Sequence, residues 1–598
     1  MLKNLTVIAA AAITIALPFV FRRSESVSSW KSGDPVLVII SPHNEAIRYE
    51  FGQAFSKWHK EHFGKPVKVD WRNVGGTTEI MRYLAAEYTA AFRSWWIGSG
   101  REWPEGGGAM ILDRRFRSDK PPPADEGGDA MVAWETKRAL HEAFRAADSP
   151  KAFSAKVDLF FGGGTYDHGK AFKQGLTVVP WDPAQPPVGV LATPGGRILV
   201  PERMSGETWR TAGFFGTCLS TFGICYNEDR LADLEIGEPP AHWHDLAAPP
   251  CFGQLGVADP TKSGSIAKAF EMIIHEQCHH AVREAGYSSG QVEAFEELIG
   301  KARLPPGEMP PDVPVAYQAA VERGWVRGLR LVQRIGANAR YFTDSASKVP
   351  IDVSMGDATA GLAIDFYGRY QAEKSRGPDG RARMVYVTPS GGSSVSADPI
   401  SLLRGAEHRE LAVRFIRFVL AEEGQKLWNY APGTPGGPEK FALRRLPIRR
   451  DFYRSEDREF QAAFERHAKH TVDRLGDPSV DPYELAGQFT YRSRWTGGHF
   501  SIHRDLIRAM CLDAGEELRS AWGAILEQGG PGEQPEAVAL LERMPVRPAP
   551  LTWTSALSIG KEHDRLDYMR EWTLFFRQSY AEAEAKVGTT RGERSREP

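Results

Sequence analysis

The sequence predicts a two-lobed α/β protein followed by a mostly helical C-terminal extension. Three observations lead to this fold class. Buried-type strands alternate with amphipathic helices from Val36 onward. A second series of strands and helices begins near Phe222. Beyond Gly436 the strand patterns stop, and helical segments rich in Arg, Glu and Trp follow. Alternating strands and helices are typical of doubly wound sheets, and two such series in one chain favour two lobes.

Length and composition limit the possible functions. The chain has 598 residues, which is too many for one compact core, so several structural units are expected. A hydrophobic content of 42% and a charged content of 25% are typical of soluble globular proteins. The formal net charge of -2 gives no basic excess, which argues against nucleic acid as a partner. Five cysteines form no CxxC motif, and their odd number leaves at least one thiol outside any intramolecular pairing.

The N-terminal segment, residues 1–25, has the pattern of an export signal or an uncleaved membrane anchor. Lys3 precedes an apolar run from Leu5 to Phe21, and Arg22 and Arg23 follow it. The run is at the short end for a full membrane span. We therefore expect a periplasmic or otherwise extracytoplasmic protein, tethered to the inner membrane if the segment is retained.

The first strand–helix series opens the folded part. A buried-type strand at 36–41 precedes apolar residues at helical spacing between Ile47 and Trp58. A strand at 67–71 leads to a second helix that starts at 75–78. Helical periodicity then fails from about residue 92 to 130, where glycine and proline clusters predict an irregular surface insertion.

The stretch from Lys156 to Val179 is the most informative one in the chain. An apolar strand at 157–161 runs into Gly162–Gly164, and Thr165 or Asp167 is expected to cap the helix that follows. Glycines allow close backbone approach, and a helix start offers free N–H groups with a partial positive charge. The stretch is either a site for a small polar or anionic ligand or a tight turn without one.

The second series runs from about 222 to 389, and a helix with an apolar face at Leu411, Phe415, Phe418 and Val419 follows. The predicted division is a signal or anchor at 1–25, lobe 1 at 35–222 with the insertion 92–130, lobe 2 at 223–385, a return to lobe 1 at 386–436, and a helical C-terminal extension at 437–598.

Residues 36–428 resemble the extracellular solute-binding proteins of bacterial ABC transporters, in particular type II periplasmic binding proteins for ferric iron, phosphonates and similar cargo. The resemblance lies in the segments 38–45, 158–164, 223–227, 258–265 and 406–425. It implies two lobes, joined by two extended crossings near 222–227 and 383–389, that close over a small solute. It also implies an ABC permease as partner, no cofactor and no catalysis. The insertion at 92–130 and the chain after about Asp451 depart from the family pattern.

The resemblance implies that helix starts with small polar residues converge on the ligand. The predicted ligand-binding residues are His43, Asn44, Gly75, Gly76, Thr77, Gly163, Gly164, Thr165, Ser263, Gly264, Ser265 and Tyr367. Asn44 and Thr77 are also expected to be N-caps. Because these segments supply N–H donors and neutral hydroxyls, the expected ligand is a small anion or a metal–anion pair.

Two of these residues are candidate metal ligands, only if the cargo is ferric iron. His43 and Tyr367 fall where the resembling ferric-binding proteins place a histidine and a tyrosine pair. The pair here reads Phe366-Tyr367, so one phenolate donor is missing.

A different class of function rests on His275-Glu276-Gln277-Cys278-His279, which matches the H-E-x-x-H signature of zinc metallopeptidases. No Gly-x-x-His follows, and no third ligand is defined by spacing. The apolar stripe that starts at Ile266 predicts that His275 and His279 lie on a solvated helix face. A zinc peptidase is therefore kept as the alternative to a binding protein.

Overall fold

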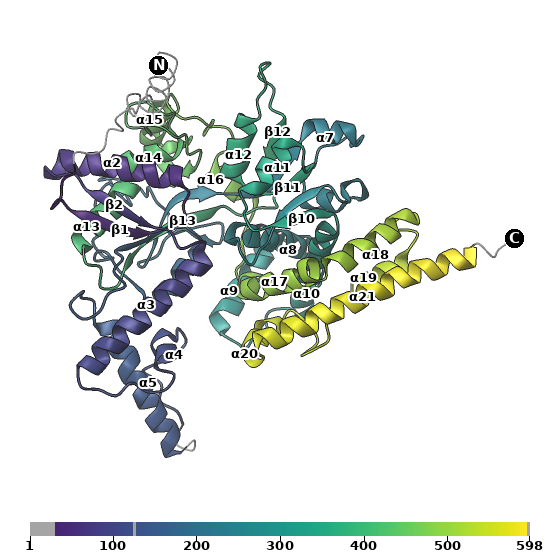
Figure 1. Cartoon of the computed structure of the whole chain (residues 1–598), viewed down its shortest axis with the longest axis horizontal. Coiled ribbons are helices and arrows are strands. Elements are labelled where there is room, and N and C mark those ends of the chain that lie inside the picture. The colour runs from purple at the N-terminus through teal and green to yellow at the C-terminus, as the bar shows by residue number, and fades with distance from the viewer. Residues whose placement is uncertain (1–29, 124–126, 595–598) are drawn as a thin grey trace, which may run out of the picture.

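The computed structural model describes residues 30–123 and 127–594, which form two lobes around two sheets (Figure 1). The predicted signal or anchor, residues 1–25, lies outside the described residues. Within the described ranges, no helix is both long and apolar enough to cross a bilayer.

Lobe 1 is built on a seven-stranded mixed sheet of order β14-β7-β13-β3-β1-β2, with β4 paired to β13. Its strands are β1 (Val36–Ile40), β2 (Lys68–Arg72), β3 (Leu159–Phe161), β4 (Thr177–Val178), β7 (Phe215–Ser220), β13 (Ser396–Leu403) and β14 (Leu446–Pro447). β1 runs parallel to β2 and β3, and β13 runs antiparallel to β3, β4 and β7. A small separate ribbon pairs β5 (Arg203–Met204) with β6 (Glu207–Thr208).

Helices cover both faces of this sheet. Apolar residues of α2, α13 and α14 pack on one face, and those of α3, α5 and α6 pack on the other. Figure 1 shows α3, α4 and α5 as a limb that projects from lobe 1. The helices of this half are α2 (Glu45–Phe63), α3 (Thr77–Gly98), α4 (Gly107–Leu112), α5 (Gly128–Ala146), α6 (Thr165–Lys173), α13 (Arg409–Leu420), α14 (Glu422–Asn429), α15 (Arg458–His467) and α16 (Pro482–Gln488).

Lobe 2 is built on a five-stranded sheet of order β10-β9-β11-β8-β12. Its strands are β8 (Phe222–Asn227), β9 (Leu255–Ala258), β10 (Ala339–Thr343), β11 (Ala360–Ile364) and β12 (Met384–Val387). The helices of this half are α7 (Glu228–Asp233), α8 (Gly264–Glu284), α9 (Ser289–Ala302), α10 (Val315–Ala337), α11 (Lys348–Met355), α12 (Asp365–Lys374), α17 (Phe500–Ile507), α18 (Gly515–Glu527), α19 (Pro535–Leu541), α20 (Ile559–Glu562) and α21 (Arg565–Arg594). A π-helical segment, Arg508–Asp513, joins α17 to α18.

The chain passes between the lobes at two crossings, as expected, but slightly displaced. β8 and β12 lie wholly in the lobe 2 sheet, so the crossings are Thr221, between β7 and β8, and residues 388–395, between β12 and β13. The two crossings touch through the Thr221 and Thr388 hydroxyl groups, which lie 3.0 Å apart.

The C-terminal extension contributes to both lobes. Apolar residues from Leu443 to Ala486 belong to the core of lobe 1, whereas those from Phe489 to Val587 belong to the core of lobe 2. Figure 1 shows the yellow and green C-terminal helices beside α8 and α10. The chain therefore passes between the lobes a third time, directly after α16.

The region predicted as an irregular insertion is partly helical. α3 continues to Gly98, α4 lies inside the region, and α5 already begins at Gly128. Phe92 and Trp96 are buried on α3 and belong to the core shared with α5. The apolar face of α3 thus continues past residue 92, so the helix does not end there. The glycine and proline clusters lie mainly in the loops that connect α3, α4 and α5.

Candidate ligand site between the lobes

Three of the predicted helix starts meet at the junction of the lobes. A Cβ atom added at Gly163, before α6, would collide with Thr77 Cγ2 at the start of α3. A Cβ atom added at Gly264, at the start of α8, would lie 3.5 Å from Thr77 Oγ1. Thus α3 and α6 of lobe 1 and α8 of lobe 2 point their N-termini at one region. We call the segments Gly75–Thr77, Gly163–Thr165 and Ser263–Ser265 the helix-start site.

The glycines at this site are explained by backbone geometry. Gly163 has a φ of 111°, a conformation that side-chain-bearing residues rarely adopt, and it lies against Thr77. Gly76 and Gly164 are the N-caps of α3 and α6, so the predicted caps Thr77, Thr165 and Asp167 lie one to three positions too late. Neither glycine has a side chain that could cap its helix, so the cap residue itself satisfies none of the first N–H groups of α3 and α6.

The start of α8 carries its own cap. The Ser263 hydroxyl accepts a hydrogen bond from the Ile266 N–H at 3.3 Å and lies 3.1 Å from the Ser265 hydroxyl. Gly264 is exposed, and Ser263 and Ser265 are half-buried. The helix-start site is therefore open to solvent and presents hydroxyls, peptide N–H groups and positive helix ends, which favour an anion. Two carboxylates also lie at these helix starts, Glu79 beside Gly75 and Gly76, and Asp167 beside Thr77.

The fourth predicted helix start does not face this opening. Asn44 is the N-cap of α2, as predicted, and its side chain accepts the Ile47 N–H at 3.1 Å. His43 is 4% exposed and packs edge-on against Phe161, with ring centroids 4.7 Å apart. Its Nε2 lies 2.9 Å from Asp398 Oδ2. His43 thus lies beneath the glycine turn, where a Cβ atom on Gly162 would collide with its ring.

Asp398 is the centre of a buried ion pair that the sequence did not reveal. It pairs with Arg445 and accepts the Gly163 N–H at 2.6 Å. Burial works against the carboxylate, but Arg445 and His43 hold the pKa of Asp398 well below its usual range. Desolvation lowers the pKa of His43, despite the neighbouring Asp398, so the imidazole is neutral near pH 7. Asp398 therefore fixes the Gly163 turn from inside lobe 1.

Tyr367 approaches the same ion pair from lobe 2. It lies in the first turn of α12, and burial raises the pKa of its hydroxyl; Arg445 opposes this increase and Asp398 adds to it. The Arg445 guanidinium stacks on the ring of Phe366, 3.8 Å from its centroid. His43 and Tyr367 are thus both brought to the Asp398–Arg445 pair, which lies directly beneath the Gly163 turn of the helix-start site. A ferric ion held by both would have to displace that pair.

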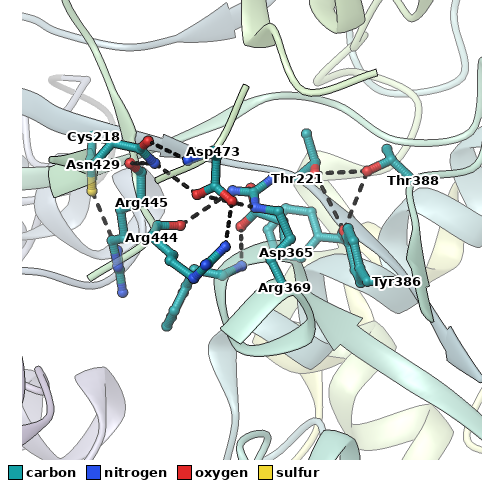
Figure 2. A network of polar contacts seen from close by, with 12 residues as sticks. Cys218, Thr221, Asp365, Arg369, Tyr386, Thr388, Asn429, Arg444, Arg445 and Asp473 are labelled. Atoms are coloured by element: carbon teal, nitrogen blue, oxygen red, sulfur yellow. Dashed lines mark hydrogen bonds and ion pairs between the residues drawn. The ribbon is translucent and has the colours of Figure 1, made fainter. Parts of the chain in front are cut away.

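A second polar network joins the lobes beside the crossings (Figure 2). Arg369 of α12 pairs with Asp365 at 3.0 Å and donates to the Arg444 carbonyl at 3.4 Å. Arg444 pairs with Asp473 at 2.8 Å, and Asp473 also accepts from the Asn429 side chain at 2.9 Å. Lobe 2 is therefore linked to the C-terminal extension where that extension lies on lobe 1.

The H-E-x-x-H motif lies in the interior of lobe 2, which corrects the predicted solvated face. His275 is fully buried, and His279 is half-buried beneath residues 489–496. His275 Nε2 accepts the Arg492 N–H at 3.2 Å, so its Nδ1 carries the proton toward Thr496 Oγ1 at 2.9 Å. His279 Nε2 donates to the Thr490 carbonyl at 2.9 Å. The amphipathic pattern missed this because the covering segment lies more than 200 residues later.

The motif therefore does not assemble a zinc site. Ring nitrogens of both histidines are already hydrogen-bonded to the covering segment. The Glu276 carboxylate is not bonded to that segment and accepts a hydrogen bond from the Gln277 side chain at 3.2 Å. In the ranges 30–123 and 127–594, no cluster of three or more His, Cys, Asp or Glu side chains is arranged to hold a metal ion.

Comparison with known proteins supports a binding protein. Residues 146–431 match the family model described as bacterial extracellular solute-binding protein. A Haemophilus influenzae protein, named only as uncharacterized, is 24% identical over 223 residues, which are 37% of this chain and 49% of that protein. The match thus spans about half the length of that relative.

Three solved structures that match this chain are named as binding proteins, each with a TM-score below 0.5. The periplasmic binding protein AfuA from Actinobacillus pleuropneumoniae, with fructose-6-phosphate bound, has a TM-score of 0.39 and 15% identity, over 73% of this chain and 97% of that one. Iron-bound HitA from Pseudomonas aeruginosa has a TM-score of 0.36 and 15% identity, over 73% and 99%. PotD of a spermidine/putrescine transporter from Streptococcus pneumoniae has a TM-score of 0.40 and 13% identity, over 79% and 99%.

The family match covers the helix starts of α6 and α8, both crossings and α12, and it agrees with the resemblance found in the sequence. Over residues 146–431, just under half of its length, the chain is therefore similar to the bacterial extracellular solute-binding proteins.

Proposed function

We propose that this protein captures a small anionic solute, or a metal–anion pair, between its lobes outside the cytoplasmic membrane and delivers it to an ABC permease. The observation that carries the proposal is the convergence of the α3, α6 and α8 starts from both lobes on one solvent-accessible region. Three helix N-termini add their N–H groups and positive ends there, which favours a negative ligand over a neutral or cationic one.

Extracytoplasmic placement is supported by the family match and by the apolar segment near the N-terminus. Delivery to a permease is supported by the family alone.

A thermal-shift panel tests the ligand class. The purified protein is mixed with phosphate, phosphonates, dicarboxylates, ferric salts with and without phosphate, and neutral sugars. A ligand present at about one hundred times its dissociation constant should stabilise the fold by about 2.7 kcal/mol. We expect anions to raise the melting temperature. A rise with neutral sugars alone would show that the anion proposal is wrong.

A matched pair of variants tests the location. Gly264→Val narrows the space between α8 and Thr77, and should weaken binding of the anion found in the panel. Gly290→Val is the control, because Gly290 also lies in the first turn of an exposed helix, with nothing within 4 Å of an added Cβ atom. Calorimetry measures the affinity of each variant for this anion. Equal affinities would show that the anion does not bind at the helix-start site.

A further inference from the structure

A pocket of about 290 Å³ adjoins the helix-start site, between α3, α6 and α17. Thr78 of α3 and Tyr166 of α6 line it, one residue beyond Thr77 and Thr165 of the helix-start site. α17 closes the pocket with Phe500, Ser501 and Arg504. Since α3 and α6 belong to lobe 1 and α17 packs on α8 of lobe 2, the walls of the pocket come from both lobes.

Three cationic side chains line this pocket: Arg82, Lys170 and Arg504. None of them pairs with Asp or Glu among the residues that the structure describes, although 76 acidic residues balance 74 basic ones in the chain. Arg504 is held by neutral acceptors only: the Pro260 carbonyl at 2.8 Å, the Thr261 carbonyl at 2.6 Å and the Thr78 hydroxyl at 3.2 Å. Its position is fixed, and no carboxylate forms a close ion pair with it among the described residues.

The cations in the pocket repel one another. Burial lowers the pKa of Lys170, and Arg114, Arg504 and Arg82 lower it further, while Asp167 acts in the opposite direction. Asp167 is the one acidic residue of the lining, and burial raises the pKa of its carboxyl although Thr77 and Arg504 favour its charged form. One carboxylate against three cations leaves an excess of positive charge that an entering anion would relieve.

The rest of the lining indicates the size and chemistry of the occupant. Tyr166 and Phe500 form an aromatic pair across the pocket, with ring centroids 5.4 Å apart. The Gln174 Oε1 atom is buried and has no hydrogen-bond partner within the described protein, so it can accept a hydrogen bond from a ligand hydroxyl. These features fit a compact hydroxylated molecule with charged oxygens.

We propose that α17 completes an anion pocket with α3 and α6, and that this pocket takes a compact oxyanion with two or more negative charges. The inference rests on the proposed function, because it assigns the charged end of the captured solute to this pocket. Phosphate esters and hydroxylated polycarboxylates share the required chemistry. An anion held by Arg82 and Lys170 on one side and Arg504 on the other bridges the lobes. The C-terminal extension is therefore part of the binding site.

Isothermal titration of the full chain tests the anion pocket with glycerol 3-phosphate, citrate and inorganic pyrophosphate, at constant ionic strength, with glycerol and chloride as blanks. Lys170→Gln and Arg82→Gln each remove one lining charge, and Lys173→Gln is the control on α6, because Lys173 is exposed and does not line the pocket. Loss of a charge-assisted hydrogen bond should weaken binding about tenfold or more in each lining variant. Lys173→Gln should bind as the wild type does. The oxyanion that binds best separates the phosphate and carboxylate sources.

Several results would overturn the anion pocket. The proposal is wrong if none of the three oxyanions gives a binding heat above that of the chloride blank. It is also wrong if both lining variants bind the oxyanion with wild-type affinity. If Gly264→Val abolishes binding while the lining variants do not, the proposed function stands and the pocket does not. If the lining variants lose binding and Gly264→Val does not, the pocket stands and the helix-start site does not. Both lining variants should fold as the wild type does, because neither Arg82 nor Lys170 has an ion pair to lose among the described residues. Melting curves of the variants check this.

Discussion

Among single residues, Glu276 is a buried carboxyl group of lobe 2 with a raised pKa. It is 4% exposed on α8, and desolvation raises its pKa to about 7, although Gln277 and Arg327 oppose the shift. A carboxyl whose pKa is higher in the folded state binds more protons when folded, so folding stability falls as pH rises from about 4.5 to 7. Glu276 therefore destabilises the protein at neutral and alkaline pH.

Replacing this carboxyl with an amide should stabilise the protein. At pH 8, Glu276→Gln should raise the free energy of unfolding by up to about 3 kcal/mol, and the gain should vanish below about pH 4. Urea denaturation at several pH values measures this change in the free energy of unfolding. Glu308 is exposed, and Glu308→Gln is the control, whose free energy of unfolding should differ from the wild type equally at every pH. A zinc peptidase would instead lose its activity in Glu276→Gln, so a peptidase assay on the same protein also tests the alternative function.

Ion pairs between residues far apart in the sequence leave no local pattern from which they could be predicted. Asn44 was predicted as a cap because the signal is local: a polar side chain three residues before the N–H that it binds. Asp398 and Arg445 lie 47 positions apart and share no periodic pattern, so their buried pair becomes visible only in the folded chain. Its effect on His43 and Tyr367 could not be predicted for the same reason.

Among the elements, the C-terminal helices show what periodicity does and does not determine. The sequence predicted a mostly helical extension beyond Gly436, and the structure has α17, α18 and α21 there. A pattern identifies which face of a helix is buried but not which partner buries it. The division of the extension between the two cores therefore had to come from the structure.

The long helix α21 should stabilise lobe 2 through one face only. Trp572 is fully buried in the lobe 2 core, while Leu574, two residues later, is 60% exposed. Trp572→Ala should lower the free energy of unfolding by about 3–5 kcal/mol, because it leaves a large cavity. Leu574→Ala should change it by less than about 0.5 kcal/mol. Denaturant titration compares the two, and equal effects would mean that α21 is not part of the core.

At the scale of the whole molecule, the number of connections between the lobes governs how far they can separate. Two crossings touch at Thr221 and Thr388, and a rotation about this point would open the helix-start site. The third passage, after Gln488, and the link between Arg369 and the Arg444 carbonyl add restraints near the crossings. α17 adds another restraint, between lobe 2 and the starts of α3 and α6, since Arg504 donates to Thr78 and Phe500 packs on Tyr166.

This last contact joins pocket walls that come from the two lobes, so it should hold the lobes together without a ligand. Removing it in the double variant Phe500→Ala with Arg504→Gln should allow opening and increase the radius of gyration in small-angle X-ray scattering. Leu574→Ala, which alters an exposed side chain of α21, should scatter as the wild type does. An oxyanion that bridges the lobes should reduce the radius of gyration of the double variant less than that of Phe500→Ala alone. The double variant lacks Arg504, one of the three cations that would hold the oxyanion. If the double variant has the wild-type radius of gyration, the restraint lies in the arginine network beside the crossings, and Arg369→Gln becomes the variant that should open the molecule.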